Sequence, residues 1–275
     1  MRGGAQSHLM RASDGNLYVV KFSNNPQHVR VLANEFIVTR LAELASLPVP
    51  PIELVEVSEW LIQHTPDLRI QLAGTSFPVA AGLQFGSRYA QPPWEGPVLD
   101  WLPQSMLARV RNFETFTGML ALDKWLCNAD SRQAIFFRKG RARNYTVNFI
   151  DHGYCFNAGE WTFPDSPLRG AYPWNEVYAR VHGWESFEPW LTRIEEMPPA
   201  ALWSIAEIVP PEWYSGDTAA LERLMERLLA RRARVRELIG SFRDSDREPF
   251  PLWERKGSIA VPRQFPEGAA GGLVM

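Results

Sequence analysis

One break in the sequence pattern constrains the fold of this chain more than any other feature. The stretch Gln91–Pro97 is rich in proline and glycine, which interrupt both helices and strands. Before it, hydrophobic residues recur mainly with the period of two that is typical of strands, and after it with the longer period of helices. We therefore predict an α+β chain with a small β-rich lobe over residues 1–90 and a larger, mainly helical lobe over residues 91–245. Residues 246–275 are predicted to form a partly disordered tail.

Composition excludes several classes of protein. The 275 residues are 45% hydrophobic and 22% charged, as in folded globular proteins. The net charge is only −2, so no overall positive field exists to hold nucleic acid, and no direct nucleic-acid binding is expected. The apolar stretches are shorter than the roughly 20 residues of a membrane span, so no membrane association is expected. The N-terminus lacks the apolar core of a signal peptide and the chain has 2 cysteines, which favours a cytoplasmic location.

A lysine and a glutamate of the first lobe form a candidate pair. Alternation of apolar residues predicts a hairpin that ends near Phe22, with Lys21 on a face that also carries apolar side chains. A helix is predicted over residues 27–46, with Glu35 beside its apolar stripe. Each charge would be costly to bury alone, so we expect Lys21 to pair with Glu35 or with a phosphate. The alternative is a lysine that extends into solvent from the end of its strand.

The residues that precede this hairpin are small or polar, in the order Gly3-Gly4-Ala5-Gln6-Ser7. Small residues allow the backbone to approach an anion, and successive N–H groups can bind phosphate oxygens. A pair of glycines is otherwise common in turns, and this alternative stays open.

Two aspartates bracket a predicted hairpin in the second lobe. Asp130 precedes the apolar run Ala134–Phe137, and Asp151 follows the apolar run Tyr145–Ile150. Because the two ends of an antiparallel pair lie side by side, the carboxylates are expected to be neighbours. One carboxylate can then orient a nucleophilic hydroxyl while the other holds Mg²⁺ against phosphates. The alternative is that both aspartates cap turns.

Further elements are predicted from periodicity. Strands are expected over residues 52–57 and 77–89, with a short helix near Trp60. Helices are expected from about Pro103 to Cys127 and from Thr218 to about Phe242. On the last helix, the basic run Arg231-Arg232-Ala233-Arg234 is expected to form a solvated face, with a partner-binding patch as the alternative.

These features occur in an order that resembles the HipA-like kinases, a bacterial family with a protein-kinase-like fold. The segments that carry the resemblance are Gly3-Gly4-Ala5-Gln6, Val19-Val20-Lys21-Phe22, Asn34-Glu35, Asn128-Ala129-Asp130 and Ile150-Asp151-His152-Gly153. They span Gly3 to Gly153. The resemblance implies a bilobal kinase fold in which the lobe boundary falls near residues 91–97.

The resemblance also implies a role for each of these segments. The loop Gly3 to Ser7 would cover the phosphates of ATP, and Lys21 would contact the α- and β-phosphates while Glu35 aligns it. Asp130 would accept or orient the proton of the substrate hydroxyl, and Asp151 would coordinate Mg²⁺.

One position departs from the kinase pattern. Kinases of this type carry an asparagine as a second metal ligand five residues after the catalytic aspartate, and here that residue is Ile135. Gln133 and Asn128 are the nearest replacements for the missing ligand. Pairing Asp123 with Asn128 would restore the spacing, but Asp123 lies within a predicted helix and is disfavoured.

The sequence therefore favours an ATP- and Mg²⁺-dependent HipA-like kinase that phosphorylates a Ser or Thr hydroxyl of an unidentified protein. The main alternative is a pseudokinase that binds nucleotide or protein without transfer, because Ile135 replaces the expected ligand. A kinase of small molecules or lipids is a third possibility, since it would use the same two aspartates.

Overall fold

The structure of the protein, a computed structural model, describes residues 4–253. In the first lobe, four antiparallel strands form a sheet in the order β1-β2-β6-β3. These strands are β1 (His8–Arg11), β2 (Leu17–Lys21), β3 (Ile52–Val57) and β6 (Gly82–Arg88). The lobe also contains the helices α1 (Val31–Leu44) and α2 (Glu59–His64) and the two-stranded sheet of β4 (Arg69–Leu72) and β5 (Thr75–Pro78).

The centre of this sheet depends on a glycine. Gly86 of β6 lies opposite Val20 of β2 and Glu53 of β3. A Cβ atom at Gly86 would lie 2.4 Å from Cγ2 of Val55, so the close packing at this point requires the absence of a side chain.

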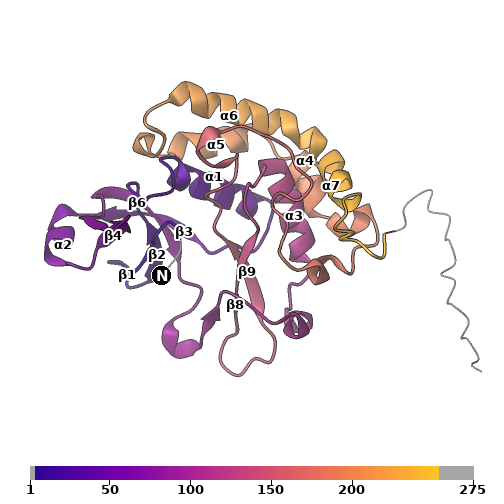
Figure 1. Ribbon diagram of the computed structural model, residues 1–275, viewed down its shortest axis with the longest axis horizontal. Coiled ribbons are helices and arrows are strands. Elements are labelled where there is room, and N and C mark those ends of the chain that lie inside the picture. Colours follow the sequence, from indigo (N-terminus) through magenta and orange to yellow (C-terminus); the bar gives the residue numbers. More distant parts are fainter. Residues whose placement is uncertain (1–3, 254–275) are drawn as a thin grey trace, which may run out of the picture.

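The second lobe contains a three-stranded sheet of β7 (Val98–Leu99), β8 (Gln133–Phe137) and β9 (Thr146–Ile150). Its α-helices are α3 (Thr115–Leu126), α4 (Trp190–Glu195), α5 (Pro199–Ile208), α6 (Thr218–Arg231) and α7 (Val235–Arg243). The short 3₁₀ helices are η1 (Pro93–Glu95), η2 (Gln104–Arg109), η3 (Ala158–Glu160), η4 (Asn175–Tyr178), η5 (Trp184–Phe187), η6 (Pro211–Tyr214) and η7 (Arg232–Arg234). Figure 1 shows the strands of the first lobe on one side, the helices α5, α6 and α7 along the top, and the β8–β9 hairpin pointing away from them.

Helix α1 connects the two lobes. Its side chains belong to the main hydrophobic core, which also contains the buried Trp125 of α3 and Trp213 of η6. Trp213 Nε1 donates a hydrogen bond to the carbonyl of Leu83 in β6 at 3.0 Å. A separate small cluster, centred on Val20, Phe22 and Val57, packs beneath the sheet of the first lobe. The position of Glu35 is therefore fixed by packing against both lobes.

Most predicted elements are present with shifted ends. The first hairpin, the strand over residues 52–57 and the short helix near Trp60 are confirmed. The helix predicted over residues 27–46 begins later, at Val31. The strand predicted over residues 77–89 is divided between β5 and β6.

Two predicted helices are wrong in part. In the region where a helix was expected from Pro103, residues 104–109 form the 3₁₀ helix η2, and the α-helix begins only at Thr115 because residues 109–111 pair with Tyr145 beside β9. The last helix is not continuous, since η7 separates α6 from α7. Of the predicted tail, residues 246–253 are described and Phe250 packs in the main core, while residues 254–275 lie outside the described part. Within residues 4–253, no helix has the length and apolar character needed to cross a membrane.

Candidate active site

Lys21, Glu35 and Asp151 meet at the junction of the lobes. Lys21 ends β2, and its Nζ atom donates to Glu35 Oε1 and to Asp151 Oδ1, the latter at 2.8 Å. Glu35 is 2% exposed, and its Oε1 also accepts the backbone N–H groups of His152 at 3.0 Å and Gly153 at 2.9 Å. The predicted pairing of Lys21 with Glu35 is confirmed, and the same carboxylate fixes the backbone that follows Asp151.

Burial and charge act against each other in this cluster. Burial opposes ionisation of Asp151, but the Lys21 ammonium outweighs burial and lowers the pKa of Asp151 to about 2. Burial disfavours the charged form of Lys21, yet Glu35 and Asp151 together raise its pKa above the ordinary lysine value. Lys21 is therefore a cation and Asp151 an anion at neutral pH.

A cavity of about 420 Å³ opens beside this cluster. It is lined by Gly4, Gln27, Ala129, Asp130, Gln133, Asp151 and Tyr154. In the β8–β9 register Gln133 faces Ile150, so Asp130 before β8 and Asp151 after β9 lie at the same end of the hairpin. The predicted proximity of the two aspartates is confirmed.

The loop before β8 is held by a buried network of Asp123, Asn128 and Arg132, whose side chains do not line the cavity. Asn128 is fully buried; its Nδ2 donates to Asp123 Oδ1 at 2.9 Å, and its Oδ1 accepts the N–H of Asp130 at 3.1 Å. Arg132 is also buried and donates to both carboxylate oxygens of Asp123, at 2.5 and 2.9 Å. Asn128 is thus engaged in shaping the loop, and Asp123 pairs with an arginine instead of facing the cavity.

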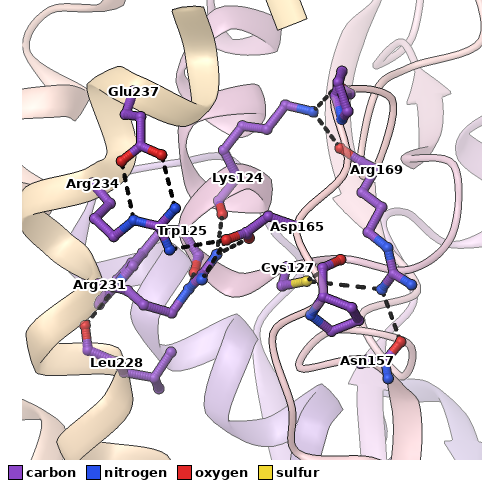
Figure 2. A network of polar contacts seen from close by, with 12 residues as sticks. Lys124, Trp125, Cys127, Asn157, Asp165, Arg169, Leu228, Arg231, Arg234 and Glu237 are labelled. Carbon is purple, nitrogen blue, oxygen red and sulfur yellow. Dashed lines mark hydrogen bonds and ion pairs between the residues drawn. The ribbon is translucent and has the colours of Figure 1, made fainter. Parts of the chain in front are cut away.

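A second network, shown in Figure 2, fixes the segment 165–170, which follows the site in the sequence. Lys124 Nζ donates to the carbonyls of Pro167 at 2.6 Å and Arg169 at 2.5 Å. Gly170 N–H in turn donates to the carbonyl of Asp130 at 3.2 Å. The segment 167–170 therefore links Lys124 of α3 to the loop of Asp130.

The expectation of a solvated basic face at Arg231 is wrong. Arg231 is 5% exposed and pairs with Asp165, its Nη2 lying 2.7 Å from Oδ1 (Figure 2). Its guanidinium also donates to the carbonyls of Lys124 and Trp125 near the end of α3. The carbonyls of the last helical turn lack partners within their helix, and Arg231 satisfies two of them.

The glycine-rich loop contributes to the cavity through Gly4. Gly3 lies outside the described residues. The side chain of Gln6 is hydrogen-bonded to the backbone of β4. Its Nε2 donates to the carbonyl of Gln71, and its Oε1 accepts the N–H of Gln71. Ala5 is buried and Ser7 is half-buried, and neither lines the cavity.

The oxygen atoms at the cavity fit a divalent cation. Asp151, Asp130 and Gln133 supply carboxylate and amide oxygens, and Mg²⁺ is commonly held by one or two carboxylates together with substrate phosphates. Across residues 4–253 no group of three or more His, Cys, Asp or Glu residues is placed to hold a metal by itself. Ile135 lies in β8 opposite Asn148, with no ligating atom to offer.

Two residues of the cavity were not predicted from the sequence. Tyr154 lies directly after the Asp151-His152-Gly153 motif, and this adjacency could have indicated it. Gln27 lies in the loop between β2 and α1 and carries no pattern, yet its Oε1 is buried without a hydrogen-bond partner among the described residues. A buried acceptor of this kind is available to a donor on a bound molecule.

Comparisons with known proteins give a family match and similar solved structures. A sequence model of the HipA-like kinase family matches residues 1–237. A search of curated proteins finds no match. Among solved structures, HipA from the Shewanella oneidensis toxin–antitoxin complex of HipA, HipB and operator DNA is similar, with a TM-score of 0.51, 14% identity and coverage of 90% of this chain and 67% of that chain.

Two other kinases are similar at lower scores. The Helicobacter pylori proinflammatory kinase CtkA has a TM-score of 0.48 and 14% identity, covering 84% of this chain and 94% of that chain. The Golgi casein kinase with Mn/ADP bound has a TM-score of 0.49 and 12% identity, covering 90% of this chain and 72% of that chain.

Proposed function

The chain belongs to the HipA-like kinase family, and on that premise we propose that it transfers the γ-phosphoryl group of ATP to a Ser or Thr hydroxyl of a protein. The observation that carries this proposal is the contact of Lys21 with both Glu35 and Asp151, beside a cavity that also contains Asp130. A buried lysine between two carboxylates next to an open polar cavity is the arrangement that phosphate binding in kinases uses.

Lys21 has a donor left for a phosphate. An ammonium has three N–H donors, and Glu35 and Asp151 take two of them. Both partners also hold the side chain in one position, so little conformational entropy is lost when a phosphate oxygen accepts the third. We propose that the glycine-rich loop before β1 adds the N–H of Gly4 as a further donor to the phosphate.

Asp151 and Gln133 are the residues that would hold Mg²⁺. When bound, the cation supplies neutralisation of the charge on the β- and γ-phosphates. Asp151 is already ionised at neutral pH, so no proton has to leave before it binds a cation. Asn128, predicted as an alternative ligand, would first have to leave Asp123 and the Asp130 N–H.

Asp130 is the residue that we propose to orient the acceptor hydroxyl. Its side chain is exposed at the cavity, and its Oδ1 accepts the N–H of Ser131 at 2.7 Å. The second oxygen can then accept the proton of an incoming hydroxyl group, which aligns that hydroxyl for attack on the γ-phosphorus.

A pseudokinase is the second candidate, and Ile135 favours it. The position that would carry the second metal ligand lies in β8 with an aliphatic side chain. In this version, ATP would bind to Lys21, and Asp151 would hold its Mg²⁺, without phosphoryl transfer.

Two assays distinguish an active kinase from a pseudokinase. Calorimetry measures binding of ATP with Mg²⁺, and radiolabelled ATP measures phosphate transfer to a protein acceptor or to the chain itself. We expect binding and transfer in the wild type, and a loss of transfer of at least about 100-fold in Asp130→Asn with binding retained. Asp246→Asn, a matched change at an exposed carboxylate, should transfer phosphate normally. Binding with no transfer above that of Asp130→Asn would establish the pseudokinase, and no binding at all would refute both.

A further inference from the structure

Six cationic side chains surround the end of the β8–β9 hairpin that is farther from the candidate active site. We call them the basic face, and they are Arg109, Arg111, Arg138, Lys139, Arg141 and Arg143. The loop between β8 and β9 carries four of them and projects from the lower edge of the molecule in Figure 1.

Backbone hydrogen bonds hold the segment of Arg109 and Arg111 beside the β8–β9 loop, which carries the other four cations. The N–H of Tyr145 donates to the carbonyl of Arg109, and the N–H of Arg111 donates to the carbonyl of Tyr145, both at 2.9 Å. The side chain of Arg111 also donates to Oγ1 of Thr146 at 2.6 Å. The arginines that precede α3 are thus fixed beside the start of β9, next to the arginines of the loop.

The charges of the basic face have no acidic partners. The segments 101–113 and 131–150 contain no Asp or Glu. In the described part of the chain, none of the six cations forms an ion pair, whereas Arg30, Arg132 and Arg231 each pair with an aspartate. Like charges held close together repel one another, so a concentration of unpaired cations is relieved by an anionic partner.

The basic face has a fixed relationship to the candidate active site. Strand β8 begins at Gln133, which lines the cavity, and ends at Phe137, directly before Arg138. At a rise of about 3.3 Å per residue, the strand separates the two by about 17 Å. Asp130 lies three residues before β8, so an extended peptide with its hydroxyl near Asp130 would reach the basic face about five to eight residues away.

We propose that the basic face docks an acidic segment of the protein acceptor, about five to eight residues from the residue that is phosphorylated. This inference rests on the proposed kinase function. Charge complementarity is the reason for an acidic partner, and the length of β8 sets the spacing.

An acidic protein segment fits this surface better than a nucleic acid does. A nucleic acid carries a phosphate at every nucleotide and requires a continuous positive track. The basic face is short, and in the sequence the exposed carboxylates of Asp100 and Glu114 flank the segment that carries Arg109 and Arg111. The exposed Trp101, in the segment before Arg109, could stack on a base, so an RNA belongs among the probes.

Fluorescence anisotropy with defined probes tests the proposal. The acidic probe is a fluorescein-labelled peptide with one serine followed, after a neutral spacer of about six residues, by a run of glutamates. The matched neutral peptide has glutamine in place of each glutamate, and a labelled single-stranded RNA of mixed sequence is the third probe. We expect the acidic peptide to bind most tightly, with an affinity that falls as salt rises.

A charge reversal in the loop should remove this preference. In Arg141→Glu/Arg143→Glu, binding of the acidic peptide should weaken by about tenfold or more at low salt. The control Arg11→Glu/Arg223→Glu makes the same change in net charge at two exposed arginines outside the basic face, and should bind within about twofold of the wild type. An equal loss in both variants, equal binding of the two peptides, or tighter and loop-dependent binding of the RNA would each overturn the proposal.

Kinetics separate this proposal from the proposed function. With the acidic peptide as acceptor, the loop variant should raise KM and leave kcat nearly unchanged, because docking lies away from the reacting atoms. Asp151→Asn should bind the peptide as the wild type does and transfer no phosphate. Loop-dependent binding without transfer by the wild type would refute the kinase function alone, while transfer with no dependence on the loop would refute the docking site alone.

Discussion

Lys21 Nζ lies 2.8 Å from Asp151 Oδ1, and this contact joins the end of β2 in the first lobe to the end of β9 in the second. The same ammonium contacts Glu35, which is 2% exposed and is bound to the backbone that follows Asp151. One lysine therefore connects the two lobes and the helix α1 between them. Its removal affects stability as well as phosphate binding.

Lys21→Met should lower the free energy of unfolding by about 3–5 kcal/mol, because it leaves the carboxylate of Glu35 buried without its cation. The double variant Lys21→Met/Glu35→Leu should be more stable than the sum of the two single changes predicts. Urea denaturation of the four proteins measures this coupling. The exposed pair of Arg40 and Glu43 is the control, and the same cycle there should give about 0–1 kcal/mol. A coupling no larger at Lys21 than at Arg40 would contradict the structural role.

Arg132→Met should be similarly destabilising, by about 3–5 kcal/mol, because Asp123 is fully buried and would lose its guanidinium partner. Asn128 also depends on Asp123, so the loop of Asp130 should loosen and phosphate transfer should fall. Denaturation and transfer assays measure both effects. Arg132→Met/Asp123→Leu should recover part of the stability without recovering transfer, and recovery of full transfer would disprove the support of the loop.

The sequence predicted the strands of the site better than it predicted the contacts between them. Two apolar runs predicted the hairpin of β8 and β9 and, with it, the proximity of Asp130 and Asp151. Such patterns reflect local burial, which the order of residues determines directly. Lys21 and Glu35 could be paired because each was an isolated charge among apolar neighbours.

Contacts between residues that are far apart in the sequence could not be predicted from local patterns. Arg231 was expected in solvent, but Asp165 and the end of α3 bind it, and these groups are far from it in the sequence. Residues 103–114 were expected to continue the helix α3, but only the 3₁₀ helix η2 forms there, and Asn112 binds both backbone groups of Val147 and keeps the segment that follows η2 beside β9. In both cases a tertiary contact overrode a local preference.

Gly170→Ala should be destabilising and should reduce transfer. Gly170 has φ +71°, and a Cβ atom there would lie 2.5 Å from Cβ of Asp123. The strain adds to the cost of a positive φ in alanine, which is about 1–2 kcal/mol. Gly216 is the matched control, since it has φ +68° and open space around it, so Gly216→Ala should show only the backbone cost. Thermal unfolding compares the two, and equal losses would show that the contact with Asp123 has no effect.

The buried Lys124 should make stability increase with pH above about 8. Burial lowers the pKa of Lys124 to about 8, with Asp123 opposing the shift, whereas an unfolded lysine has its ordinary value near 10.5. Between these values the unfolded chain binds more protons than the folded chain, so the free energy of unfolding rises with pH, by at most about 1.4 kcal/mol per pH unit. Burial raises the pKa of Tyr172 and Tyr178, which has the opposite effect, but both tyrosines remain in Lys124→Met and cancel in the comparison. The difference in unfolding free energy between wild type and Lys124→Met, measured by urea denaturation from pH 7 to 10, should therefore grow in favour of the wild type. A difference that stays constant over this range would show that Lys124 keeps its proton in the folded protein.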